Sequence, residues 1–468
     1  MKISLLNEHE IDRIKEATET ILENKGFKVL HEGIRKKARE AGAIVDDKEE
    51  TVRLPKELLR RLLSGLPSSY KIRTIDGGEY TIGGGEQYIG AIVTDPWIID
   101  YETGAPRRPS LEDLRVNTIL TQLNPKVAQV SRMDFPVTDF EGKSSSLRAL
   151  EMHLLNHTKH YAVYAGSLEG YRQWEEIGDL IAPGGKLKDS GLMTVAVAVV
   201  SPMVLTEINA ELLLGATGHG FPVIPTVCPM AGTTSPYSKA ATFLQGNVEN
   251  IFIAALTQML NPGNPFVYAF GPAVSDMHSG KNLYYTFDKT LWRIATVEMA
   301  KSYGLPSMKE CGGTLTHRYD MQSGAESMLS MMIAQTIGGD LLSGLGSCYN
   351  ANGLSSEMIV IQSAWLEAAE YLSKGMSFEL FDEGVESLNN HTWGGHFLMD
   401  DLTLKNLRSG EFFASGLFDM SGEDKGALSM LERAHARVEE ATAGFVSPVP
   451  GEVQEKLRRY FHDLYAGL

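Results

Sequence analysis

Residues 193–200 read MTVAVAVV, and residues 222–227 read PVIPTV. Each is a short, nearly continuous apolar run that ends at a serine, proline or cysteine, as expected for a strand buried on both faces of a sheet. Similar runs stand at 127–130, 161–165, 266–270, 307–311 and 341–345, with mostly helical pattern between them. Strands that alternate with helices predict βα units with right-handed crossovers and a parallel sheet.

The number of strands decides between two architectures. We place an eighth strand at 377–380, which would close the sheet into an α/β (β/α)8 TIM barrel. An open, doubly wound sheet is the alternative. Residues 1–120 are expected to form an extension packed on the barrel, with helices over 8–65 and hairpins over 69–105, followed by the catalytic barrel at 121–423 and C-terminal helices at 424–468.

Composition excludes several classes of protein. The net charge of −16 and the isoelectric point near 5.3 argue against sequence-independent binding to nucleic acid or to an anionic membrane. No apolar run reaches the length of a membrane span, and the N-terminus becomes charged before a signal-peptide core could form. Three widely spaced cysteines fit a reducing compartment, so a cytoplasmic protein is expected.

Two sets of side chains could bind a metal ion. Cys228, Cys311 and Cys348 each follow a predicted strand, and three thiolates there could hold zinc. Because cysteine is also a common buried residue, we prefer a structural role for them. His153, His157 and His160 could share a helix face, but the adjacent Lys159 would repel a cation, so we interpret them as surface or supporting histidines and expect no metal.

Aromatic side chains gather at or near the predicted strand ends. Aromatic faces attract a quaternary ammonium ion through their quadrupole, by roughly 0.5–2 kcal/mol each. Strand aromatics are more often core residues, however, so the pattern alone names no function. The candidates are Tyr164, Tyr268, Phe270, Tyr88, Trp97 and Tyr349.

A series of ordered motifs then resembles one known family along almost the whole chain. They are DYETG (100–104), SPM (201–203), AGTTSP (231–236), QGNVE (245–249), NPGNP (261–265), DMHSG (276–280), YGLPS (303–307), DMQSG (320–324) and GGHFL (394–398). On these motifs the sequence is similar to the trimethylamine methyltransferase superfamily of corrinoid-dependent methyltransferases. The resemblance implies a TIM barrel independently of the strand count.

The resemblance also implies a branch of that family. Members that demethylate trimethylamine carry pyrrolysine near the strand that here continues as ECGGT (310–314), and this sequence has no such residue. The implied activity is that of the non-pyrrolysine branch, which demethylates glycine betaine, proline betaine, carnitine or butyrobetaine. In each case the methyl group goes to Co(I) of a small corrinoid protein, so the implied cofactor is cob(I)alamin supplied by a cognate partner.

The chemistry explains why the special residue can be absent. A quaternary ammonium already has a neutral tertiary amine as its leaving group, so no further activation is required. The protein must orient the N–CH₃ bond, exclude water and admit the corrin face, and no general base is needed. Glycine betaine is the expected substrate, and dimethylglycine is then the product.

Several residues are candidates for contact with such a substrate. Arg318, with His317 beside it, could grip the betaine carboxylate, although Arg318 could equally pair with Asp320 on the surface. His278 is a second carboxylate candidate, and Glu249 could balance the ammonium charge. Glu249 and Gln322 are the two catalytic candidates. Gln322 and His396 match family positions, but no individual role is assigned to either.

Other functions stay open at this point. A zinc-dependent corrinoid methyltransferase would use the three cysteines, and a non-catalytic betaine-binding barrel would keep the aromatic and cationic groups. Another betaine could replace glycine betaine. Enzymes of this size often pair through symmetric interfaces, so a homo-oligomer is expected from base rates.

Overall fold

A central parallel sheet organises the computed structural model, which describes residues 3–188, 190–422 and 428–467. The sheet has seven strands in the order β13-β11-β10-β9-β6-β18-β17, and every pair in it is parallel. The strands are β6 (Tyr88–Ile92), β9 (Val127–Ser131), β10 (His160–Val163), β11 (Met193–Ala198), β13 (Val223–Thr226), β17 (Met308–Glu310) and β18 (Leu341–Ser343).

The two edges of this sheet bind the same segment of chain. Phe266 bridges to Val223 of β13, and Tyr268 bridges to Ser307, next to β17. The Val267 amide donates to the Val223 carbonyl at 3.1 Å, and the Tyr268 amide donates to the Pro306 carbonyl at 2.8 Å. The fold is therefore mixed α/β with a curled parallel sheet, an arrangement consistent with a TIM barrel.

The prediction of a strand at 377–380 is wrong. That segment follows helix α11 (Ser356–Lys374), pairs with no strand and is largely exposed. The position between β9 and β18 belongs instead to β6, from a segment expected to form hairpins. Gly90 allows the close approach there, since a Cβ atom on it would lie 3.0 Å from the Gln129 amide nitrogen.

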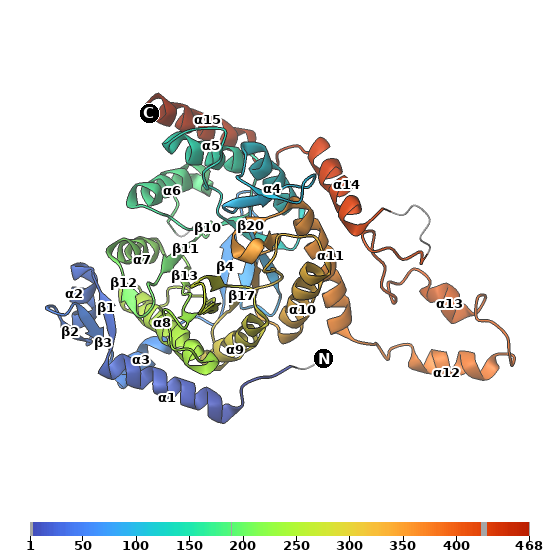
Figure 1. Cartoon of the computed structure of the whole chain (residues 1–468), viewed down its shortest axis with the longest axis horizontal. Helices are drawn as coiled ribbons and strands as arrows, with labels where there is room; N and C mark the ends of the chain where they lie inside the picture. The colour runs from blue at the N-terminus through green and yellow to red at the C-terminus, as the bar shows by residue number, and fades with distance from the viewer. Residues whose placement is uncertain (1–2, 189, 423–427, 468) are drawn as a thin grey trace.

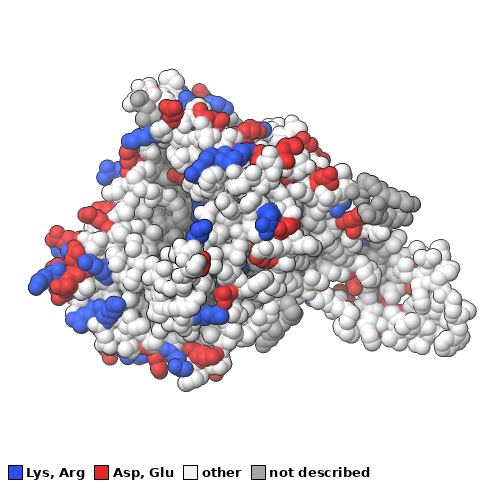
Figure 2. All heavy atoms as spheres, in the orientation of Figure 1, with Lys and Arg blue, Asp and Glu red and all other residues white. Residues whose placement is uncertain are grey.

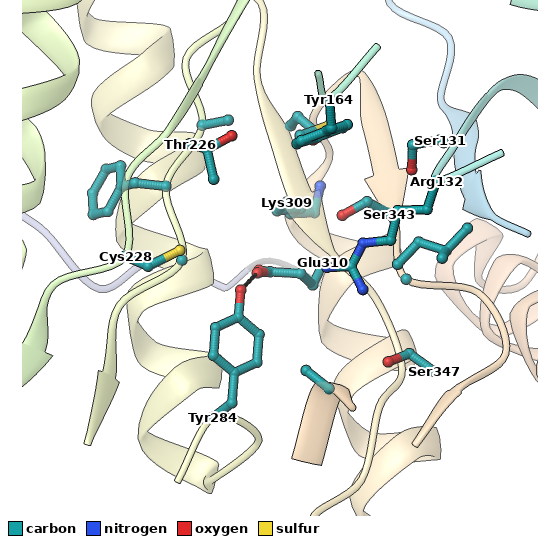
Figure 3. Close-up of a pocket in the computed structure, with 18 of the residues that line it drawn as sticks. Ser131, Arg132, Tyr164, Thr226, Cys228, Tyr284, Lys309, Glu310, Ser343 and Ser347 are labelled. Carbon is teal, nitrogen blue, oxygen red and sulfur yellow. Dashed lines mark hydrogen bonds between the residues drawn. The ribbon is translucent and has the colours of Figure 1, made fainter. Parts of the chain in front are cut away.

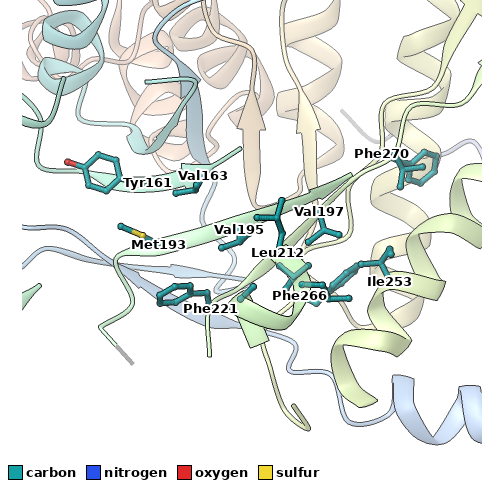
Figure 4. Packing of buried hydrophobic residues seen from close by; sticks show 14 of the residues in the cluster. Tyr161, Val163, Met193, Val195, Val197, Leu212, Phe221, Ile253, Phe266 and Phe270 are labelled. Carbon is teal, nitrogen blue, oxygen red and sulfur yellow. The ribbon is translucent and has the colours of Figure 1, made fainter. Parts of the chain in front are cut away.

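Helices surround the sheet, as Figure 1 shows. They are α4 (Leu111–Leu123), α5 (Lys143–Leu154), α6 (Leu168–Ile181), α7 (Glu207–His219), α8 (Lys239–Leu260), α9 (Phe287–Tyr303), α10 (Met321–Ile337) and α11. Val195 and Val197 of β11, Leu212 of α7 and Phe266 are fully or almost fully buried and belong to one core cluster (Figure 4). Burial of such side chains between sheet and helices is the main stabilising contribution to the fold.

The N-terminal region mixes helices with short strands. Helices α1 (Glu8–Asn24), α2 (Glu32–Glu40) and α3 (Lys56–Leu63) lie in the range predicted to be helical, but β1 (Phe27–Val29), β2 (Ile44–Asp46) and β3 (Thr51–Arg53) were missed. These strands form a sheet with β12 (Val204–Leu205). The predicted hairpin is present as β4 (Tyr70–Arg73) and β5 (Glu79–Ile82). The boundaries at 120 and 423 stay a prediction.

Small sheets and C-terminal helices complete the molecule. The first small sheet contains β14 (Met230–Ala231), β15 (Ala273–Ser275) and β16 (Asn282–Leu283). The second contains β7 (Trp97–Ile99), β8 (Pro106–Arg107), β19 (Ser347–Cys348) and β20 (Gly353–Leu354). The C-terminal helices are α12 (Phe381–Asn390), α13 (Asp401–Asn406), α14 (Met430–Ala443) and α15 (Gly451–Ala466). Among the helices of the described residues, none is long and apolar enough to cross a membrane.

Candidate active site

A cavity of about 610 Å³ lies at the carboxyl ends of the central strands (Figure 3). Strand ends supply part of its wall, including Ile92, Ser131, Thr226, Glu310 and Ser343. The loops that follow the strands supply the rest. Since strands of a parallel sheet direct the residues after them to one common edge, this is where such folds place their active sites.

Aromatic rings form much of the cavity wall. Tyr164 follows β10, Phe270 follows the segment 266–268, and Tyr284 and Tyr285 stand between β16 and α9. The Tyr284 and Tyr285 rings meet edge to face with centroids 5.1 Å apart. Tyr285 is fixed further because its hydroxyl donates to the Ser347 hydroxyl oxygen at 3.0 Å. The cavity can therefore present aromatic faces to a cation.

Glu310, at the end of β17, is the centre of a charged cluster behind these rings. Its Oε1 accepts a hydrogen bond from the Tyr284 hydroxyl and lies 3.3 Å from Lys289 Nζ. Its Oε2 lies 4.0 Å from Arg293 Nε. Burial alone would raise the pKa of Glu310, but the charges of Lys289 and Arg293 and the Tyr284 hydrogen bond hold that pKa below its ordinary value. The carboxylate is thus ionised at neutral pH.

Lys289 is buried, and its ammonium lies 3.3 Å from the centroid of the Tyr284 ring. It also donates to the Pro272 carbonyl at 3.0 Å. Burial lowers the pKa of Lys289 to about 8, although the Glu310 charge opposes that shift. With Lys289 protonated, two cations face the one carboxylate of Glu310, so the cluster behind this wall of the cavity carries a surplus of positive charge.

Arg132 follows β9 and enters the cavity from the opposite side (Figure 3). Its guanidinium forms an ion pair with Asp95, which is completely buried. Among the described residues, neither carboxylate oxygen of Asp95 has a hydrogen-bond partner apart from that ion pair. Arg132 also has a backbone φ of +58°, a conformation that costs a non-glycine residue about 1 kcal/mol or more. The guanidinium is therefore held at one place on the cavity wall.

The three cysteines do not converge on this cavity. Cys228 lines it, whereas Cys311 and Cys348 are buried and stand outside the lining. Burial raises the pKa of the Cys228 thiol and opposes formation of a thiolate. Within residues 3–188, 190–422 and 428–467, no three His, Cys, Asp or Glu side chains are grouped as a metal site would require. The arrangement expected for a three-cysteine zinc site is not found.

The three histidines are buried, which excludes the surface position, one of the two roles predicted for them. The His153 and His157 rings stack with centroids 4.7 Å apart, and the His160 Nε2 atom lies 2.7 Å from the Thr194 hydroxyl. Burial lowers the pKa of His153 to about 3 and of His160 to about 4, so both rings are neutral. They belong to the protein interior beside β10.

Of the aromatic candidates predicted from sequence, Tyr164 and Phe270 are found among the described residues that line the cavity. Tyr268 is buried, and its hydroxyl donates to Asn247 Oδ1 at 2.5 Å. Arg318 is exposed and pairs with Asp320 at 2.8 Å, the surface arrangement considered as its alternative. His317 meets Tyr349 edge to face, with ring centroids 5.1 Å apart. The described cavity lining contains neither Tyr268 nor Arg318. It also lacks His317 and Tyr349.

The remaining candidates lie elsewhere. Glu249 is buried and accepts hydrogen bonds from Ser201 Oγ at 2.7 Å and from the Met203 amide at 2.9 Å. Gln322 donates to Glu326 Oε1 at 2.8 Å on the exposed side of α10. The other four stand outside the described cavity lining: Tyr88 near the amino end of β6, Trp97 under the Arg108 guanidinium, and the exposed His278 and His396.

Sequence reasoning missed the charged groups of the cavity. Glu310 and Arg132 carried a usable signal, because each stands at or just after the end of a predicted strand. Asp95, Tyr284 and Lys289 carried none. Asp95 follows the unrecognised strand β6, whereas Tyr284 and Lys289 reach the cluster from the loop and helix beyond β16.

The chain is similar in sequence to known methyltransferases along almost its whole length. A family model described as trimethylamine methyltransferase (MTTB) matches residues 1–464. The chain is 27% identical to a glycine betaine methyltransferase of Desulfitobacterium hafniense (strain Y51), over 98% of this chain and 96% of that protein. It is 22% identical to the trimethylamine methyltransferase MttB of Desulfitobacterium hafniense (strain DSM 10664 / DCB-2), over 96% of this chain and 91% of that relative.

Among solved structures, the fold is similar to the crystal structure of the Methanosarcina barkeri monomethylamine methyltransferase (MtmB). The TM-score is 0.50 at 11% identity, over 97% of this chain and 92% of that one. At so low an identity the likeness concerns the fold alone.

Proposed function

The chain belongs to the trimethylamine methyltransferase family, and we propose that it moves a methyl group from glycine betaine to Co(I) of a corrinoid protein. The observation that carries this proposal is the cavity, in which aromatic rings stand beside the fixed guanidinium of Arg132 and a positively charged wall. Similarity to a glycine betaine methyltransferase over nearly the whole chain supports the same substrate.

The charges of the cavity suit a zwitterion better than a simple amine. Glycine betaine carries a carboxylate about 3–4 Å from its ammonium, by ordinary bond lengths. Arg132 can bind that carboxylate through two parallel hydrogen bonds. The rings of Tyr164 and Phe270 line the same cavity and are then available to the trimethylammonium group, whereas the Tyr284 ring already contacts the Lys289 ammonium. Trimethylamine has no carboxylate and would leave Arg132 without a partner from the substrate.

Within this proposal the residues of the chain bind and orient rather than exchange protons. The leaving group is a neutral tertiary amine, so no acid or base is required at the nitrogen. Cation–π contacts of modest strength suffice, because the positive charge leaves the nitrogen during the reaction and tighter binding would stabilise the ground state. Arg132 and the rings fix the direction of the N–CH₃ bond and exclude water.

The surface beside the cavity suits a corrinoid partner. Tyr237 and Met277 are exposed on neighbouring loops, and a Cβ atom on Gly232 would touch both side chains. Met321 is exposed at the start of α10, at the carboxyl end of the sheet. These side chains offer an apolar rim to the face of a corrin ring. Bound in its own protein, cob(I)alamin supplies Co(I), the nucleophile that accepts the methyl group.

We also propose that the segment 266–268 is the eighth strand of a closed (β/α)8 barrel. Its hydrogen bonds to Val223 on one side and to Pro306 on the other support this assignment. A closed barrel brings strands from both ends of the seven-stranded order to a common mouth. Glu310 of β17 and Cys228 after β13 can then face the same cavity, as the lining residues do.

An anaerobic assay with free cob(I)alamin tests the proposed reaction. Glycine betaine, proline betaine, carnitine and trimethylamine are offered separately, and methylcobalamin is followed by its absorption spectrum. We expect methylcobalamin and dimethylglycine in equal amounts from glycine betaine. Turnover of trimethylamine, which has no carboxylate, would contradict the role given to Arg132. Silence with every amine, while glycine betaine still binds in calorimetry, would indicate a binding protein instead.

A further inference from the structure

A turn beside the cavity, formed by residues 349–351, has an unusual backbone. Tyr349, Asn350 and Ala351 follow β19 and have φ angles of +49°, +56° and +62°. Asparagine adopts this left-handed region more readily than most side chains, but tyrosine and alanine rarely do. Three such residues in a row persist only where the surrounding structure holds them. Since Asn350 and Ala351 line the cavity, this strain stands at the candidate active site.

Backbone hydrogen bonds hold the turn from two sides. The Asn350 amide donates to the Thr314 carbonyl at 2.9 Å, in the loop that follows β17. The Asn352 carbonyl accepts from the Trp97 amide at 3.0 Å, at the start of β7 and in the segment that follows β6. The turn is therefore fixed between loops that follow two strands of the central sheet, which explains how a left-handed backbone can be maintained there.

The Asn350 side chain binds the segment 282–285, here called the tyrosine segment, through both ends of its amide. Its Oδ1 atom accepts from the Tyr284 amide at 2.6 Å, and its Nδ2 atom donates to the Asn282 carbonyl at 2.6 Å. A side-chain amide can accept and donate at once, whereas a carboxylate can only accept. The tyrosine segment supplies Asn282, Tyr284 and Tyr285 to the cavity lining, so Asn350 ties one part of the wall to another.

The position of the tyrosine segment decides two further contacts of the wall. The Tyr284 hydroxyl donates to Glu310, as Figure 3 shows, and the Tyr285 hydroxyl donates to the Ser347 hydroxyl oxygen at 3.0 Å. Both hydroxyl groups reach their partners only while the backbone of the segment stays in place. Displacement of the segment would break both bonds and would open this wall of the cavity to water.

The outer surface of the molecule contrasts with this wall. Figure 2 shows Lys and Arg side chains interspersed with Asp and Glu on the face drawn. Charged groups at the surface pair with one another, as Lys143 does with Glu169 at 3.0 Å. Exposed pairs of this kind need no strained backbone. The strain of the turn therefore points to its cavity side.

We propose that Asn350 is a positioning residue of the cavity. Its left-handed backbone directs the side-chain amide at the tyrosine segment, and the amide then holds Tyr284 and Tyr285 in the wall. Asn350 acts through these residues and through the exclusion of water, not through contact with the reacting atoms. Its importance for the ligand rests on the proposed function, because the wall matters to a betaine only if the betaine occupies this cavity.

Hydrogen exchange of the protein without ligand tests the positioning directly. Asn350→Gly removes both side-chain bonds, and it should fold, because glycine adopts the left-handed backbone without strain. We expect the Tyr284 amide to exchange at least about tenfold faster in this variant, while amides of β11 do not change. Asn350→Asp keeps the acceptor but not the donor, so its Tyr284 amide should exchange at an intermediate rate. Equal exchange of the Tyr284 amide in the wild type and in Asn350→Gly would overturn the proposal.

Calorimetry with glycine betaine tests whether this position matters to the ligand. Asn350→Gly should weaken binding about five- to tenfold while its thermal unfolding stays near that of the wild type, and Asn350→Asp should restore part of the affinity. The matched control is Asn156→Ala. The Asn156 Nδ2 atom donates to the Met152 carbonyl at 2.7 Å, outside the described lining of this cavity, so the control should bind normally.

The two measurements separate the proposal from the proposed function. Normal binding of glycine betaine by an Asn350→Gly protein whose Tyr284 amide exchanges fast would overturn the role of Asn350 at the ligand. A wild type that does not bind glycine betaine would contradict the proposed function instead. The exchange rates would then still decide whether Asn350 holds the tyrosine segment in place.

Discussion

At the scale of single residues, the site depends on how Asp95 and Arg132 are arranged. A buried carboxylate bound to one guanidinium determines where the second edge of that guanidinium points. We expect Arg132→Gln to weaken glycine betaine binding about ten- to a hundredfold, since a hydrogen bond between charged groups contributes about 1.5–3 kcal/mol. Calorimetry measures this, and tetramethylammonium, which has no carboxylate, should bind both proteins alike.

Arg318→Ala is the matched control for that experiment. Arg318 is exposed and already pairs with Asp320, so its removal should leave betaine binding unchanged. If Arg318→Ala weakens binding and Arg132→Gln does not, the carboxylate site lies outside the cavity. From the sequence we predicted only Arg318, although Arg132 also follows a predicted strand. The feature that separates them, a buried carboxylate beside Arg132 and solvent beside Arg318, depends on contacts between distant residues.

Lys289 makes the affinity for an anionic group dependent on pH. Its pKa is lowered from the ordinary 10.5 to about 8, so a rise of pH through 8 removes its proton. Glu310, whose pKa lies below its ordinary value, stays ionised over that range. The positive surplus of the wall is therefore lost above pH 8, and glycine betaine, which does not titrate there, should bind more weakly.

Calorimetry at pH values from about 6.5 to about 9.5, which lie on both sides of the Lys289 pKa of about 8, measures that change in affinity. Lys289→Met removes this titrating group and should abolish the step near pH 8 while it lowers the affinity below pH 8. A step that remains near pH 7 would belong to Lys309, which lines the cavity and whose pKa is lowered by burial to about 7. A wild type whose affinity is flat across the range would show that the charge on Lys289 does not reach the ligand.

At the scale of elements, helix α8 fixes the loop after β11 through Glu249. The Ser201 hydroxyl and the Met203 amide both donate to this buried carboxylate. We expect Glu249→Ala to lower the free energy of unfolding by about 1–3 kcal/mol for each donor left unpaired. Glu249→Gln, which keeps an acceptor oxygen, should cost less and should bind glycine betaine normally. Urea denaturation and calorimetry measure the two effects, and lost binding in a stable Glu249→Gln would restore a role at the substrate.

The elements also show what the sequence could and could not predict. The runs at 193–200 and 222–227 are found as β11 and β13. They could be predicted because a strand that is buried on both faces needs a nearly continuous run of apolar residues, which is visible in the sequence itself. Strand β6 has an equally buried centre, but it contains Gly90 and follows the glycines at 83–85, which are typical of turns. Its place in the sheet depends on contact with Gln129 of β9, a relation between distant residues.

At the scale of the whole molecule, Asn247 joins the N-terminal helix to the barrel. Its Nδ2 atom donates to Thr18 Oγ1 of α1 at 2.7 Å and to the Tyr303 hydroxyl of α9 at 3.2 Å. Its Oδ1 atom accepts from the Tyr268 hydroxyl at 2.5 Å. One buried amide thus satisfies groups from the N-terminal extension, from α9 and from the segment that bridges the sheet edges.

We expect α1 and the central sheet to unfold in one cooperative transition because of such shared contacts. Asn247→Ala leaves three buried polar groups without this partner and should lower the free energy of unfolding by about 3 kcal/mol or more. Tyr268→Phe removes one of these bonds and should cost only about 1 kcal/mol. Thermal unfolding followed by circular dichroism and by tryptophan fluorescence measures both changes. Two separate transitions in the wild type would show instead that the extension is only loosely attached, and then Asn247→Ala should shift the earlier transition alone.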